Sequence, residues 1–140
     1  MTRKPLLAVP ISALVLSMGL TAAPAVATAA QPLAQVTILS TARITDGGAS
    51  LTVRLRTLCQ PVETIQWEGF ITATQGDVFA WSGPALQCDG RQHHEDVVLP
   101  VSAEPGTAFF VRGKATVSVV LQDENTLTTH ASDTRTVHVR

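Results

Sequence analysis

The chain has 140 residues, and its composition already excludes several broad classes of protein. Hydrophobic residues make up 45% of it, which is too many for an intrinsically disordered chain. The first 29 residues have the pattern of an export signal, which leaves about 111 residues, enough for one domain with a hydrophobic core. Arg3 and Lys4 lie in that signal, so the remainder carries 8 Lys and Arg against 11 Asp and Glu, a net charge of −3. This balance excludes a nucleic-acid-binding protein, which needs a clustered basic face.

The N-terminal segment has the three parts of a secretory signal peptide. Two basic residues precede an apolar stretch at residues 6–20, and small residues follow it. Ala27 and Ala29 suit the −3 and −1 sites of signal peptidase, so we predict cleavage after Ala29, with alternatives within two residues, and a mature domain of residues 30–140. An uncleaved membrane anchor is the alternative, but a 15-residue span that contains Pro10 is short for a bilayer that needs about 20 apolar residues. We expect a secreted, extracellular product without a membrane span.

The mature chain contains two cysteines, Cys59 and Cys88. In an oxidising compartment two cysteines of one small domain usually pair. A reactive thiol pair is the alternative, but it normally needs Cys-x-x-Cys spacing or a neighbouring cation, whereas these cysteines are 29 positions apart. The spacing therefore predicts one structural disulfide.

Apolar and polar residues alternate along most of the mature chain, which is the pattern of half-buried β-strands. Asp46-Gly47-Gly48 has the composition of a turn with positive φ angles between the first two strands. In the sixth strand Phe109 and Val111 share the core-facing parity, and Phe110 faces outward. The predicted strands are residues 36–44, 51–59, 64–74, 78–82, 92–101, 109–122 and 134–140.

Seven short strands in about 111 residues are typical of an all-β, immunoglobulin-like antiparallel β-sandwich with two packed sheets. An inward Trp67 on the third strand suits that fold. The cysteines depart from it, because an immunoglobulin pair links the second and sixth strands, whereas Cys88 precedes the fifth.

Several short motifs accompany this pattern: Cys88-Asp89-Gly90 followed by His93, Arg112-Gly113 in the sixth strand, and the terminal Thr136-Val137-His138-Val139-Arg140. With them the mature chain resembles a group of small secreted single-disulfide proteins of high-GC Gram-positive bacteria that has no assigned activity. This resemblance implies a fold and export, and no function. The chain is also similar, more weakly, to the neocarzinostatin-like chromoprotein carriers. Those proteins have two disulfides, and this chain can form one.

The sequence lacks the common short motifs of catalysis. It contains no nucleophile elbow, no phosphate-binding glycine loop, no His-Glu-x-x-His and no Cys-x-x-Cys. We therefore predict that the protein is not an enzyme and needs no cofactor.

The densest polar stretch, residues 89–96, holds two histidines and three carboxylates, which are ligands that Zn²⁺ or Cu²⁺ accept. On an extended strand His93 and His94 point to opposite faces, so only His93 with Glu95, or His94 with Asp96, can share a side. We predict a solvated turn and edge strand here, and no metal site.

Three aromatic residues form the strongest candidate binding site. If the third and fourth strands are joined by a two-residue loop, Phe70, Phe79 and Trp81 lie together on the face opposite Trp67. A three-residue loop would instead send Phe79 and Trp81 to the core. An exposed aromatic patch marks a ligand or partner site, and ordinary packing beneath a loop or terminus is the alternative.

Four cations, Arg54, Arg56, Arg112 and Lys114, form two short rows on the outer faces of the second and sixth strands. In a domain with a net charge of −3, we interpret them as solvated strand faces and not as an anion site.

The sequence predicts a secreted, non-catalytic binding module. Its partner is expected to be a protein or a cell-surface glycan, bound through Phe70, Phe79 and Trp81. One alternative is a small-molecule carrier of the chromoprotein type, with an apolar cleft between sheets. Another is an inhibitor of an extracellular hydrolase that uses a protruding loop at residues 83–90, anchored by Cys88. The sequence does not define the oligomeric state.

Overall fold

The computed structural model describes Ala25, residues 29–104 and residues 106–140. Apart from Ala25 and Ala29, the predicted signal peptide lies outside the described residues. Residues Gln31–Arg140 make up one structural unit. Among the described residues, no helix is both long enough and apolar enough to cross a membrane.

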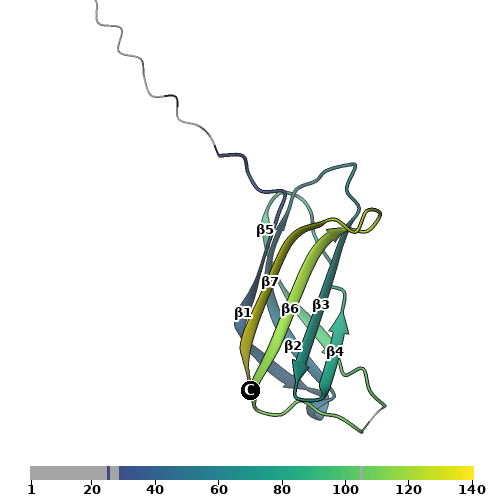
Figure 1. The fold of residues 1–140 in the computed structure, drawn as a ribbon. Coiled ribbons are helices and arrows are strands. Elements are labelled where there is room, and N and C mark those ends of the chain that lie inside the picture. Colours follow the sequence, from purple (N-terminus) through teal and green to yellow (C-terminus); the bar gives the residue numbers. More distant parts are fainter. Residues whose placement is uncertain (1–24, 26–28, 105) are drawn as a thin grey trace, which may run out of the picture. The chain divides into compact units, whose positions relative to one another are not determined.

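The unit is all-β, as predicted, and its strands form one mixed sheet in the order β4-β3-β6-β7-β1-β2-β5 (Figure 1). Neighbouring strands are antiparallel except β1 and β7, which run parallel, with Thr41 opposite His138 and Ala42 opposite Val139. Because β1 also pairs with β2, it joins all seven described strands into one sheet. The strands are β1 (Ala34–Thr45), β2 (Ser50–Cys59), β3 (Trp67–Gln75), β4 (Val78–Ser82), β5 (Gln92–Pro100), β6 (Gly113–Asp123) and β7 (Thr129–Val139).

The sheet curls until its two edge strands approach each other. Ala80 on β4 forms an isolated antiparallel bridge with Val101, the residue after β5. Next to it, the amide of Ser102 donates a hydrogen bond to the carbonyl of Phe79, with an N···O distance of 2.8 Å. The sheet is therefore a half-barrel around one core.

The core consists of apolar side chains on the concave side of the sheet, at the alternating positions that the sequence predicts. Burying one such side chain fully contributes about 1.5–3 kcal/mol to folding. The largest fully buried apolar side chains are Ile38, Leu51, Val53, Leu55, Ile71, Leu99, Val117, Val119, Leu121 and Val137.

The start of the sixth strand differs from the prediction. β6 begins at Gly113 and not at residue 109, and the side-chain directions of the preceding residues are reversed: Phe110 is 2% exposed, while Phe109 and Val111 lie at the surface. Backbone contacts in the preceding loop explain the difference. The amide of Phe110 donates to the carbonyl of Gly48 at 2.9 Å, and the side chain of Gln75 bonds both backbone groups of Val111. These contacts hold the segment as a loop that turns Phe110 inward.

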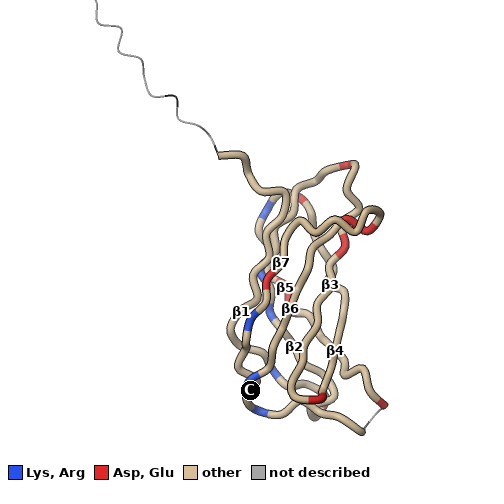
Figure 2. The backbone as a smooth tube through the Cα atoms, in the orientation of Figure 1, with Lys and Arg blue, Asp and Glu red and all other residues tan. Residues whose placement is uncertain are grey.

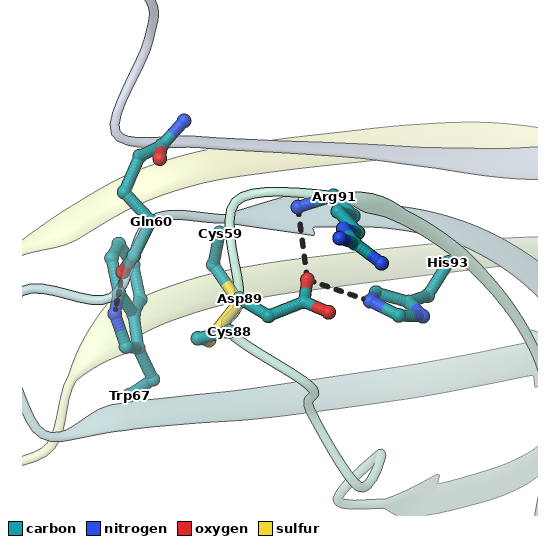
Figure 3. Close-up of a disulfide and its surroundings, with 7 residues drawn as sticks. All are labelled: Cys59, Gln60, Trp67, Cys88, Asp89, Arg91 and His93. Atoms are coloured by element: carbon teal, nitrogen blue, oxygen red, sulfur yellow. Dashed lines mark hydrogen bonds and ion pairs between the residues drawn. A yellow bond between two sulfur atoms is a disulfide. The ribbon is translucent and has the colours of Figure 1, made fainter.

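The predicted disulfide between Cys59 and Cys88 is confirmed (Figure 3). Cys59 ends β2, and Cys88 lies in the segment between β4 and β5. The amide of Gly90 donates to the carbonyl of Cys59 at 3.0 Å, so a backbone hydrogen bond accompanies the covalent link. The disulfide therefore fastens the entry of β5 to the end of its sheet neighbour β2.

Candidate binding face

The β3–β4 hairpin has the register that places its aromatic residues on the outer face. The strands are joined by a two-residue turn, Gly76 and Asp77, of which Gly76 has a φ of 58°. Thr74 then lies opposite Phe79, and Thr72 opposite Trp81. The structure therefore has the two-residue alternative, with even residues of β3 facing odd residues of β4.

Phe70, Phe79 and Trp81 form an exposed cluster, here called the aromatic face. They are 42%, 43% and 51% exposed, and the ring centroids of Phe70 and Trp81 are 5.7 Å apart with an interplanar angle of 31°. A large aromatic side chain buries about 150–250 Å² when fully covered. At about 25 cal/mol per Å², covering the exposed halves of these three rings would release roughly 6 kcal/mol before any cost of binding.

Two rows of side chains extend from the aromatic face across the outer surface of β3, β6 and β7, and we call them the hydroxyl rows. Each row begins at an aromatic residue of β4 and continues through one hydroxyl-bearing residue on each following strand. The first row is Trp81, Thr72, Ser118 and Thr134, and the second is Phe79, Thr74, Thr116 and Thr136. In the first row the hydroxyl oxygens of Ser118 and Thr134 are 3.0 Å apart and hydrogen-bonded.

Charged side chains lie at the two ends of this surface and not within it. At one end Glu68 accepts a hydrogen bond from the side-chain Nε2 of Gln122 at 2.8 Å. At the other end lie Asp77, in the hairpin turn between β3 and β4, and Lys114, near the start of β6. Lys114 lies on the same face of β6 as Thr116 and Ser118. Figure 2 shows the intervening parts of β3, β4 and β6 without charged positions.

Trp67, the other tryptophan, has a structural position on the opposite side of β3. It is half-buried and packs against the core. Its indole N–H donates to the carbonyl of Gln60 at 2.9 Å (Figure 3), and its ring lies edge-on to that of His130, with centroids 5.1 Å apart. The two tryptophans are thus in different environments, one holding the chain after β2 and the other facing solvent.

The polar stretch at residues 89–96 is occupied by pairwise contacts. A carboxylate oxygen of Asp89 is 2.8 Å from Nε2 of His93 and accepts from the amide of Arg91 at 2.9 Å (Figure 3). Glu95 accepts from the amide of Ala85 at 2.7 Å. In the part of the chain that the structure describes, no three His, Cys, Asp or Glu side chains group closely enough to hold a metal ion.

Local contacts shift the pKa values of these carboxyl groups in opposite directions. The pKa of Asp89 is lowered, mainly by its hydrogen bond with His93. Burial raises the pKa of Glu95, against the lowering effect of the Ala85 amide. Glu95 is therefore the carboxyl group of this stretch that takes up a proton more readily than usual.

Among the four cations singled out from the sequence, Arg54 has a defined partner. Its guanidinium donates to both carboxylate oxygens of Asp96 on β5, at 2.7 and 2.9 Å. This bond lowers the pKa of Asp96. Arg56, Arg112 and Lys114 are exposed, and β2 and β6 are separated in the sheet by β7 and β1, so the structure does not bring the two cationic rows together.

The segment between β4 and β5, which holds the loop at residues 83–90, contacts the rest of the domain at several points. Pro84 is buried against Gly69, and Leu86 packs on the core. The Ala85 amide and the Cys88 disulfide hold it at two further points.

A groove of about 310 Å³ lies over β1, β2 and β5. Of its lining residues only Leu39 is apolar, and the others are Thr41, Arg43, Thr52, Arg54 and Asp96. A carrier of an apolar small molecule needs a mostly apolar cavity, which this groove is not.

Two features were not predicted from the sequence. One is the alignment of the hydroxyl rows across the strands, and the other is the role of the Asp123 carboxylate in the turn between β6 and β7. Asp123 is 5% exposed and accepts from the amide of Asn125 at 3.1 Å, the hydroxyl of Thr126 at 3.0 Å and the amide of Gln66 at 3.3 Å. These hydrogen bonds lower the pKa of Asp123, and the bond from the Asn125 amide has the largest effect. A turn motif of the type Asp-x-Asn-Thr was the available signal for the local part of this arrangement.

No protein-family model matches the chain, and a search of curated proteins found no significant relative.

Proposed function

We propose that this chain is an exported, non-catalytic binding module, and that the aromatic face with its hydroxyl rows is the binding surface. The observation that carries the proposal is the clustering of Phe70, Phe79 and Trp81, each more than two-fifths exposed, on one side of one hairpin. Exposed aromatic clusters bordered by polar groups are typical of interaction sites, because covering them releases free energy.

Two features support export. The N-terminal 29 residues have the pattern of a signal peptide, and Cys59 and Cys88 are paired, which is the usual state of cysteines in an oxidising compartment. The cleaved product would be the secreted form of the domain.

We further interpret the fold as a variant of the immunoglobulin-like sandwich. In that interpretation β2 and β5 make one layer and β4, β3, β6 and β7 make the other, with β1 pairing to both. The strand order and the parallel pairing of β1 with β7 are consistent with it. The binding surface is then the outer face of the larger layer.

A non-catalytic role is supported by how the charged side chains are used. Asp96 pairs with Arg54, Asp89 with His93, and Asp123 with the groups of its own turn. These pairs lie apart and do not converge on a shared cavity where a substrate could react.

The experiment is a binding measurement on the oxidised domain labelled at its C-terminus. Binding to intact cells and to cell-surface fractions of the producing organism would be compared for the wild type and the Phe70→Ala/Trp81→Ala variant. We expect at least a tenfold loss of affinity, since aromatic residues at the centre of an interface commonly contribute about 2 kcal/mol or more each. Val98→Ala is the matched control, because Val98 is 49% exposed on β5, outside the proposed surface. Equal loss in the control, or none in the double variant, contradicts the proposal.

A further inference from the structure

We propose that the ligand of this surface is a neutral polysaccharide, stacked on the aromatic face and hydrogen-bonded by the hydroxyl rows. The inference rests on the proposed function and specifies its ligand. Its basis is that two rows of hydroxyl side chains run from the aromatic residues of β4 across the neighbouring strands at the regular spacing of the sheet, and that charged residues lie only at the ends of this surface.

The aromatic side chains suit the apolar faces of sugar rings. A pyranose presents a patch of C–H groups on its ring face, and these carry a small positive charge. The face of an aromatic ring is negative, so the two surfaces attract each other while both lose contact with water. Trp81 and Phe70, with centroids 5.7 Å apart, form a continuous platform on which such a ring can lie.

The hydroxyl rows suit the polar edges of the same rings. Thr72 lies beside Trp81 and Thr74 beside Phe79, so each aromatic ring of β4 has a hydroxyl group on the next strand. Beyond them Ser118 and Thr116 continue the two rows on β6. A hydroxyl side chain both donates and accepts, as does a sugar hydroxyl, so the rows can bond a polysaccharide without a fixed donor pattern.

The charge distribution selects a neutral ligand. The hydroxyl rows and the aromatic face contain no Lys, Arg, Asp or Glu, and the charged residues of this surface, Glu68, Asp77 and Lys114, border it. An anionic polysaccharide would need cations along its path, and its binding would weaken with salt. Binding here should instead be insensitive to salt.

The size of the uncharged area distinguishes this ligand from a protein or a second copy of the chain. Four strands about 4.8 Å apart and the five residues from Phe70 to Thr74 give a footprint of roughly 14 Å by 14 Å, or about 200 Å². A stable protein interface buries about 800 Å² per partner and avoids charges at its centre. The uncharged area matches a short length of polysaccharide, whereas a protein partner would have to extend over the charged residues that border it.

The test is depletion of the oxidised domain from solution by insoluble cellulose, chitin, β-1,3-glucan, mannan and starch, at low and high salt. We expect retention on at least one of them, unchanged by salt, and at least a tenfold loss for Trp81→Ala. The decisive variant is Thr72→Val/Thr74→Val, which keeps side-chain shape and β-propensity but removes two hydroxyl groups. It should weaken binding about fivefold or more, because each lost hydrogen bond contributes about 0.5–1.5 kcal/mol, or two- to twelvefold. Thr37→Val on β1 is the control and should bind as the wild type does.

The other outcomes separate this inference from the proposed function. If no polysaccharide retains the domain but cell binding still depends on Trp81, the ligand is wrong and the surface is right. If Thr72→Val/Thr74→Val is retained as well as the wild type while Trp81→Ala is not, the aromatic face binds the polysaccharide without the hydroxyl rows, and the inferred role of those rows is overturned. If sedimentation finds a wild-type dimer that Phe70→Ala/Trp81→Ala dissociates, a second copy occupies the face. Retention unaffected by any variant overturns both proposals at this surface.

Discussion

At the scale of single residues, Gly48 illustrates how one position joins distant parts of the chain. Its φ is 98°, a value that L side chains rarely adopt, and a Cβ built there would lie 2.8 Å from the carbonyl oxygen of Phe110. Its own carbonyl accepts the amide of Phe110 at 2.9 Å. The close approach of the backbones at Gly48 and Phe110 therefore requires glycine at residue 48. The same contact turns the Phe110 ring into the core.

Gly48→Ala should destabilise the domain by about 2–4 kcal/mol, because it adds a backbone clash to an unfavourable φ. Gly47→Ala is the control: its φ is also positive, at 64°, but a Cβ there meets nothing within 4 Å. It should cost only about 1 kcal/mol. Urea unfolding of both variants measures the difference, and equal destabilisation would show that φ alone, and not the contact with Phe110, requires glycine at residue 48.

Asp123 predicts a specific dependence of stability on pH. Its pKa in the folded domain is lowered by hydrogen bonds, first that of the Asn125 amide, relative to an unfolded value of about 3.9. A lowered pKa means that the ionised carboxylate stabilises the fold above the unfolded pKa, and that this contribution is lost as pH falls through the folded pKa. The free energy of unfolding should therefore begin to drop as the pH falls towards the unfolded pKa and continue to drop until the pH has passed below the folded pKa.

Asp123→Asn keeps the shape and one oxygen acceptor but removes the titration. It should be less stable than the wild type at pH 7 and show a shallower loss of stability in acid. Asp77→Asn removes the same charge from an exposed turn and is the control for a general charge effect. Chemical unfolding at a series of pH values checks this, and parallel pH profiles for the wild type and Asp123→Asn would contradict it.

At the scale of elements, the strands were predictable where the local pattern was sufficient. β4 has the predicted bounds, Val78–Ser82, because Gly76-Asp77 before it and Gly83-Pro84 after it end any strand. The outward position of Phe79 and Trp81 was one of two alternatives from the sequence, and the two-residue turn of the structure decides between them. The residues before Gly113 were wrongly predicted because their alternation continues that of β6, whereas a side chain 36 residues away, Gln75, holds Val111 in a loop.

The hydroxyl rows could be predicted only in part. The outward parity of Thr116 and Ser118 was visible in the sequence, but their position beside Thr74 and Thr72 depends on β6 pairing with β3. Strand order is non-local, and alternation along one strand carries no information about its neighbours.

The disulfide links the segment before β5 to β2, and its contribution can be measured. Closing a loop between positions 29 apart should stabilise the domain by about 3.5 kcal/mol through the unfolded state. Cys59→Ala/Cys88→Ala should lose about that much and become insensitive to reductant, while the wild type should fall to a similar stability when reduced. Urea unfolding with and without reductant tests this. A loss below about 1 kcal/mol would mean that the Gly90 hydrogen bond and the packing of Pro84 hold the segment without the covalent link.

At the scale of the whole molecule, closure of the half-barrel determines how firmly the aromatic face is held. β4 carries two of its three aromatic residues and is an edge strand, paired along its length only with β3. Its other edge is fixed where Val101 and Ser102 leave β5: the Val101 amide donates to Ala49 at 2.9 Å, and the Ser102 amide to Phe79 at 2.8 Å. Val101 and Ser102 thus bond Ala49, the residue before β2, and Phe79 on β4. The strand that carries the binding surface is therefore held by hydrogen bonds from the opposite edge of the sheet.

Breaking this closure should loosen β4 and leave the core strands intact. Ser102→Pro removes the amide that donates to Phe79, and we expect a loss of about 1 kcal/mol in global stability together with faster hydrogen exchange in β4 than in β2, β6 or β7. Ligand affinity should fall as well, since a mobile β4 must be ordered on binding. Thr107→Pro is the matched control, because the Thr107 amide donates within its own loop, to Glu104. Hydrogen exchange followed by NMR distinguishes the cases: unchanged protection of the β4 amides in Ser102→Pro would show that pairing with β3 alone holds the aromatic face in place.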